Sequence, residues 1–113
     1  MNNVTLLGNL VRDPDVRYTA SGLAVVNVTV ADNRKKKDGT EVVSFIDCTL
    51  WDKRGEAFAK FHSKGDRVLF QGRLEMDQWQ DKTTGQNRTK LKVVVDNWEF
   101  VKSDTPAKVP ENF

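Results

Sequence analysis

Three aromatic residues stand apart from the others because polar neighbours indicate that they are exposed. Phe45 and Trp51 alternate with Asp47 and Thr49 on one face of a predicted strand, opposite an apolar row. Trp79 lies in the segment DQWQDKTTGQNR, which contains no other large apolar residue. Exposed rings reduce solubility unless they make a contact, and such rings stack on nucleobases with little sequence preference. Packing against a partner subunit is the alternative use, and the residues alone leave both open.

Basic side chains accompany these rings and supply cations for a phosphate backbone. The candidates are Arg17, Arg34, Lys35, Lys53, Lys64, Arg73, Arg88 and Lys90. The run RKKKDG over 34–39 is too charged to bury and contains an Asp-Gly turn signal, so it is predicted to be a hairpin tip. A charge run of this kind is equally typical of a solvated loop. Aromatic rings interleaved with cations are the arrangement that binding to a single strand of nucleic acid requires.

Groups suited to catalysis are sparse. His62 is the only histidine, and it is predicted at the end of a helix, at the surface or half-buried. Cys48 is the only cysteine and lies on the apolar row of its strand, as a buried small side chain does. The sequence has no Gly-rich phosphate loop and no paired acidic metal motif. We therefore expect no enzyme activity, no cofactor and no bound metal.

Length and composition favour one small soluble domain. The chain has 113 residues, of which 38% are hydrophobic and 30% charged. It contains no apolar run near the ~20 residues of a membrane span, and its N-terminus lacks the apolar core of a signal peptide. We expect a cytoplasmic protein that makes no membrane contact. The net charge of +2 excludes a strongly basic coat, but residues 1–37 hold six Lys or Arg against three Asp.

Alternating apolar residues predict five long strands and one helix. The strands are expected over 4–10, 23–31, 42–51, 66–76 and 89–100, and the helix over 55–63. A helix between the third and fourth of five strands is the order of an OB-fold, an all-β Greek-key barrel with one helix. Phe58, Phe61 and Phe70 are predicted in its core. We expect the domain to span 1–101 and a short flexible tail to span 102–113.

Several sequence blocks resemble bacterial-type single-stranded DNA-binding proteins. The most specific block is GNLVRDPDVRY over 8–18, and NVTLLGNL over 3–10 overlaps its start. Further matches occur in order over 26–31, 45–51, 64–66, 72–74 and 79–81. The resemblance covers roughly residues 2–101 and implies an OB-fold protein of this family.

The resemblance also implies a function and an assembly. Members coat single-stranded DNA during replication, recombination and repair, at the nucleoid of a bacterial host, and are typically homotetramers, although a dimer is also possible. Their stacking aromatics fall on Phe45, Trp51 and Trp79 here, and their backbone-contacting cations on Lys53 and Lys64. The family's dimer-forming edge falls on Asn3, Val4, Thr5, Leu6 and Leu7.

The chain departs from the family pattern in four places, one of which is Glu75, Met76 and Asp77 before Trp79, where the family is often basic. The hairpin after the second strand offers Arg34 to Lys37 where the family has another stacking aromatic. Asp47 stands where a basic residue is common. The family's acidic C-terminal tip recruits replication and repair enzymes, whereas this chain ends in PENF, which keeps a terminal Phe113 without the acidic cluster. Recruitment through the tail therefore stays open.

Two other functions remain as alternatives. The first is an OB-fold protein–protein interaction module, such as a primosome-type dimer, in which the outward aromatics are buried between subunits and nucleic-acid binding is secondary. The second is an OB-fold nuclease, which requires clustered carboxylates and a divalent metal ion. The sequence contains no motif for the nuclease, so the interaction module is the stronger alternative.

Overall fold

A computed structural model of the chain describes residues 1–101. The predicted tail over 102–113, including Phe113, lies outside the described residues. The elements are β1 (Val4–Leu10), β2 (Asp15–Tyr18), β3 (Ala24–Lys35), β4 (Glu41–Trp51), α1 (Asp52–Phe61), β5 (Arg67–Gln80) and β6 (Asn87–Phe100).

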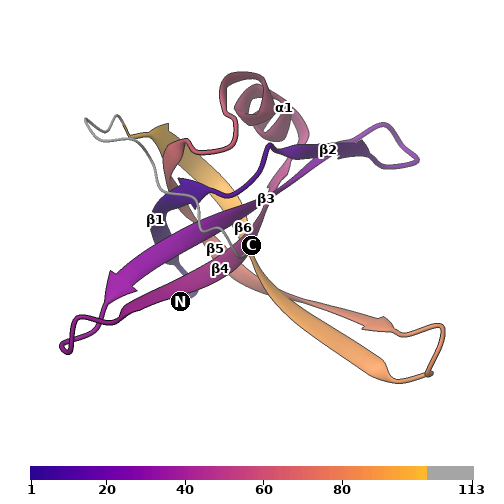
Figure 1. Ribbon diagram of the computed structural model, residues 1–113. Helices are drawn as coiled ribbons and strands as arrows, with labels where there is room; N and C mark the ends of the chain where they lie inside the picture. The colour runs from indigo at the N-terminus through magenta and orange to yellow at the C-terminus, as the bar shows by residue number, and fades with distance from the viewer. Residues whose placement is uncertain (102–113) are drawn as a thin grey trace.

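Strand β1 closes the sheet into a barrel. The strand order is β1-β5-β6-β4-β3-β2, and an additional pairing of β1 with β3 joins the two ends. Five strands therefore form the barrel, and β2 extends it at the outer edge of β3 (Figure 1). The β4–β6 pair is parallel, and the other described pairs are antiparallel. This topology confirms the predicted OB-fold.

The short strand β2 is not predicted by the sequence, and it changes the strand numbering. All four of its residues are exposed, so no apolar alternation marks it. Because β2 is added, the helix lies between strands 4 and 5 and not between strands 3 and 4. Its place in the chain, after the strand that ends at Trp51, is as predicted. The helix begins three residues before the predicted start at Gly55, because its first residues carry no apolar signal.

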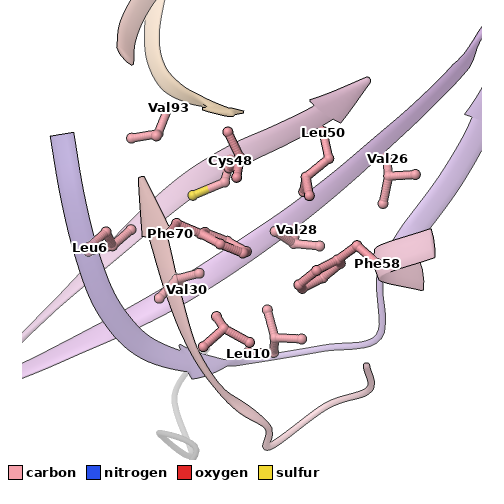
Figure 2. Close-up of a cluster of buried hydrophobic side chains, with 12 residues drawn as sticks. Leu6, Leu10, Val26, Val28, Val30, Cys48, Leu50, Phe58, Phe70 and Val93 are labelled. Atoms are coloured by element: carbon pink, nitrogen blue, oxygen red, sulfur yellow. The ribbon is translucent and has the colours of Figure 1, made fainter. Parts of the chain in front are cut away.

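The core is built from the inner faces of the strands and from the face of α1 that carries Phe58. Figure 2 shows Phe58 of α1 pointing into the same cluster as Leu50 of β4 and Phe70 of β5. The rings of Phe58 and Phe70 are fully buried, with centroids 5.3 Å apart. The prediction that Phe61 is also in the core is wrong, because Phe61 is 71% exposed. His62 takes the place beside Phe58, and the two rings stack at 4.5 Å.

Two long hairpins extend from the barrel in different directions. Figure 1 shows β3–β4 in magenta and β5–β6 in orange. The turn after β3 spans the predicted tip, where the Lys36 and Gly39 backbones close the loop. The β5–β6 pairing bulges between Gln71 and Gly72. A side chain on Gly72 would overlap the backbone of Val94, so glycine permits this close approach of the strands.

Candidate nucleic-acid interface

Phe45 and Trp51 both lie on the outer face of β4, because the alternate residues Cys48 and Leu50 are buried in the core. Phe45 is 43% exposed and Trp51 is 37% exposed, as the sequence predicts. Six positions of strand separate the two rings, which at ~3.3 Å per residue is about 20 Å. Each ring therefore has room to stack on a separate base.

Paired polar side chains cover the sheet between these rings. The register places Asp47 opposite Thr29 and Thr49 opposite Asn27. The Thr29 hydroxyl donates to Asp47 Oδ1 at 2.8 Å, and the Thr49 hydroxyl donates to Asn27 Oδ1 at 3.0 Å. The surface between the rings is thus polar and hydrogen-bonded across β3 and β4.

The unpredicted strand β2 adds Arg17 to the same face. Arg17 pairs with Val25 of β3, and Val25 pairs with Trp51 of β4. Directly paired residues share a face, so Arg17 lies in line with Trp51. Its Nε is 3.1 Å from the Asp15 carboxylate, in an exposed ion pair.

Trp79 lies on the β5–β6 hairpin, on the face that is turned towards β4. The register pairs Trp79 with Arg88 and Asp77 with Lys90, so these side chains share one face. Lys90 forms an ion pair with Asp47, which brings this face to the outer face of β4. Trp79 is 48% exposed. The predicted stacking residues therefore lie on two faces, the outer face of β4 and the Trp79 face of β5–β6, which the Lys90–Asp47 ion pair joins.

A groove of about 160 Å³ occupies this junction. We call it the hairpin groove; its lining includes Asn27, Thr29, Asp47, Thr49, Lys90 and Lys92. Lys92 is paired with Asp77 at 3.0 Å. The groove is therefore polar and holds charges of both signs. The rings of Phe45, Trp51 and Trp79 do not line it, but each lies two residues along the same strand face from a lining residue, Asp47, Thr49 and Asp77 respectively.

The carboxylate at the centre of the hairpin groove is stabilised in its charged form. Partial burial raises the pKa of Asp47, but hydrogen bonds from Lys90 and Thr29 and the charge of Arg12 outweigh burial and lower this pKa below its usual value. Arg12 also donates to the Thr29 hydroxyl at 3.3 Å. Asp47 is therefore ionised at neutral pH.

The remaining predicted backbone-binding cations divide into two groups. Arg73 is paired with Asp96 at 3.2 Å and with Glu75 at 3.9 Å, and Arg88 is paired with Asp81 at 3.2 Å. Of the eight predicted cations, Arg34, Lys35, Lys53 and Lys64 form no ion pair within residues 1–101.

The unpaired cations are spread over the molecule. Arg34 and Lys35 end β3 beside the hairpin tip, and Lys53 is two residues after Trp51 in the first turn of α1. Lys64 lies in the turn after α1, where its backbone N–H donates to Asp13 at 2.8 Å. Lys53 is close to Trp51 in sequence, but neither Lys53 nor Lys64 lines the hairpin groove.

The predicted dimer-forming residues lie along β1 or directly before it. β1 pairs with β5 from Val4 to Asn9, but with β3 only at Asn9 and Leu10. Among the described residues, the edge of β1 that faces β3 therefore has no strand partner over 4–8. Thr5 is exposed and Leu7 is 40% exposed. On the other edge, Val4 to Leu7 pair with β5, and the Leu6 side chain is buried in the core. Asn3 accepts a hydrogen bond from Gln71 at 2.8 Å.

His62 ends the helix as predicted, but it is buried and not at the surface or half-buried. Its Nε2 accepts a hydrogen bond from the Trp98 indole N–H at 3.2 Å. The Asp66 carboxylate lies 3.4 Å from Nδ1. The two ring partners are 36 positions apart in sequence, so no local pattern signals their contact. Trp98 is thereby held on the core and not in the hairpin groove.

Cys48 lies directly beneath the groove surface, and its burial confirms the prediction. Burial, with a contribution from the Asp47 charge, raises the pKa of this thiol to about 12. Because the thiolate is the reactive form, we expect no reaction with a disulfide reagent at pH ~8 in the native protein, and complete reaction in denaturant. A colorimetric thiol assay measures both rates. Equal rates in the two conditions would contradict the buried, protonated state.

The described part of the chain holds no group of three or more His, Cys, Asp or Glu side chains suited to a metal ion. None of its helices has the length and apolar character needed to cross a membrane.

Comparisons with known proteins agree on one family. A model of the single-strand binding protein family matches residues 1–101. The chain is 36% identical over 106 residues to a single-stranded DNA-binding protein of Borreliella burgdorferi, covering 91% of this chain and 71% of the relative. It is 35% identical over 106 residues to the Treponema pallidum protein of the same name, covering 91% and 59%. Against single-stranded DNA-binding protein 1 of Synechocystis, identity is 34% over 103 residues, covering 91% and 85%.

Proposed function

Because this chain belongs to the single-strand binding protein family, we propose that it binds single-stranded DNA across the outer face of β4 and the hairpin groove. Bases stack on Phe45, Trp51 and Trp79, and basic side chains contact the phosphates. The observation that best supports this proposal is that each of three exposed rings lies two residues along a strand face from a side chain that lines one polar, charged groove. Family membership also supports the prediction that the chain is not an enzyme.

The proposed role is to coat single-stranded DNA during replication, recombination and repair. Stacking contributes about 1–3 kcal/mol per base and is tolerant of sequence. Lys53 and Arg17 flank Trp51, so they are suited to phosphates on either side of a base stacked there. Coating by stacking and phosphate contacts explains why little sequence preference is expected.

The proposal includes assembly into a homotetramer. An exposed strand edge presents unpaired N–H and C=O groups that pair readily with another chain. The edge of β1 over 4–8 is of this kind within the described structure, and the exposed Leu7 side chain adds apolar surface. Antiparallel pairing of β1 with β1 of a second copy is the first step that these features support.

Titration with oligo-dT at several salt concentrations tests the function. Trp51 and Trp79 are exposed, whereas the Trp98 indole is hydrogen-bonded to His62, so stacking on bases should quench much of the tryptophan fluorescence. We expect the affinity to fall as salt rises, because phosphate contacts release counterions. Unchanged fluorescence at low salt would contradict DNA binding and favour the protein–protein interaction module.

A further inference from the structure

Four of the eight predicted backbone-binding cations form ion pairs with carboxylates of the chain itself. The pair formed by Lys90 and Asp47 differs from the others in its position. Both residues line the hairpin groove, Asp47 lies between Phe45 and Trp51 on the outer face of β4, and the pair joins the β5–β6 hairpin to β4. A DNA strand that stacks on both rings must therefore pass over this ion pair.

We propose that Asp47 competes with DNA phosphate for Lys90, and so sets how tightly and with what salt dependence this surface binds a single strand. This inference rests on the proposed function. Asp47 does not contact the DNA in this proposal and acts on binding only through its ion pair with Lys90. A phosphate that approaches the exposed Lys90 ammonium competes with this carboxylate for its charge and its N–H donors.

The geometry makes Asp47 the fixed member of the pair. Its Oδ1 accepts the Thr29 hydroxyl at 2.8 Å, and Thr29 in turn accepts a hydrogen bond from Arg12. The side chain of Lys90 is 58% exposed, whereas that of Asp47 is 35% exposed. An incoming strand therefore meets a reachable ammonium whose partner is anchored to the neighbouring strand.

This competition has a measurable effect on salt dependence. A phosphate that binds a free lysine releases about 0.7 of a monovalent counterion from a single strand. When Lys90 leaves Asp47 for a phosphate, the exposed carboxylate attracts a cation from solution, which offsets that release. The contact with Lys90 then contributes little to the slope of affinity against salt. Removing the Asp47 charge restores its contribution.

A double-mutant cycle tests the inference by oligo-dT titration across salt. The variants are Asp47→Asn, Lys90→Gln and the two combined. Glu56→Gln is the matched control, because it removes one negative charge from α1 and Glu56 has no ion pair within residues 1–101. We expect Asp47→Asn to tighten binding about two- to fivefold at low salt and to steepen the log–log slope by about 0.7. In the Lys90→Gln background its effect should shrink to that of Glu56→Gln.

Two results would overturn the inference while leaving DNA binding intact. An equal gain from Asp47→Asn in both backgrounds means that Asp47 acts as a general charge and not through Lys90. A loss of affinity in Asp47→Asn means that the carboxylate itself contributes to binding. Failure of the wild-type protein to bind oligo-dT contradicts instead the proposed function on which the inference rests.

A measurement without DNA checks the ion pair itself. The Lys90 hydrogen bond is among the interactions that hold the pKa of Asp47 below its usual value. A carboxyl-carbon NMR titration should therefore show a higher Asp47 pKa in Lys90→Gln than in the wild-type protein. An unchanged pKa would mean that the pair does not form in the free protein, whatever the DNA titrations give.

Discussion

Replacing Trp51 with alanine is expected to weaken oligo-dT binding by about 1–3 kcal/mol, or roughly 5- to 150-fold in dissociation constant. The indole stands on the outer face of β4, in line with Arg17, and 37% of its surface is exposed. Its loss removes a stacking surface without opening the core. The same change at Trp79, which is 48% exposed on the second hairpin, should have an effect of similar size.

The chain offers a matched control for this experiment. Phe61 is 71% exposed at the end of α1, outside the hairpin groove, so Phe61→Ala should leave the affinity unchanged. Trp51→Phe keeps a flat ring and should retain most of the binding. Titrations by fluorescence anisotropy of labelled oligo-dT avoid dependence on the tryptophans themselves. Equal losses in Phe61→Ala and Trp51→Ala would refute a specific role for the groove.

Replacing Phe58 with alanine is expected to lower the free energy of unfolding by about 3–5 kcal/mol. Phe58 is fully buried, and its ring packs against three other aromatic side chains. Its ring lies 4.5 Å from His62, 5.3 Å from Phe70 and 5.6 Å from Trp98, centroid to centroid. The truncation loses apolar burial and leaves a cavity between α1 and the barrel.

Urea unfolding followed by circular dichroism measures this loss. All variants must be compared at one protein concentration, because assembly of copies adds to apparent stability. Phe61→Ala is again the control, since it removes the same side chain from the exposed end of the same helix, and it should change stability by less than ~0.5 kcal/mol. A cost in Phe61→Ala that equals the cost in Phe58→Ala would show that α1 packs differently.

The main strands were predictable because alternation is a local signal. The β1 pattern gives the observed bounds Val4–Leu10, and the apolar row of β4 identifies Phe45 and Trp51 as outward-facing. Strand β2 was not predictable in this way, because its four exposed residues bury nothing. It exists through pairing with β3, which is a tertiary property. The prediction that Phe61 is buried fails for a related reason, because the space beside Phe58 is filled by His62.

The residue types of the candidate site were predictable from the sequence, but the ion pairs that its cations form were not. Residue type alone nominates Lys90 and Arg88 as cations. That Lys90 meets Asp47, 43 positions earlier, depends on the register of β5 with β6 and on the place where β6 meets β4. Several nominated cations are therefore partly neutralised in ways that a count of charges does not reveal.

The connectivity of the barrel also sets the order in which it can close during synthesis. The β3–β4 hairpin is complete once Trp51 has emerged, but β1 must wait for β5, and β4 must wait for its partner Val93 on β6. At ~5–20 residues per second, the interval between Trp51 and Val93 lasts about 2–8 s.

During this interval the nascent chain carries an open half-barrel whose inner face includes Val26, Val28 and Leu50. The charged tip at 34–37 then lies at the end of the longer of the two completed hairpins, β2–β3 and β3–β4. Charges at such a position discourage edge-to-edge association of partly made chains. We therefore expect the same lysines and arginine that are suited to phosphates in the finished protein to oppose aggregation of the partly made chain.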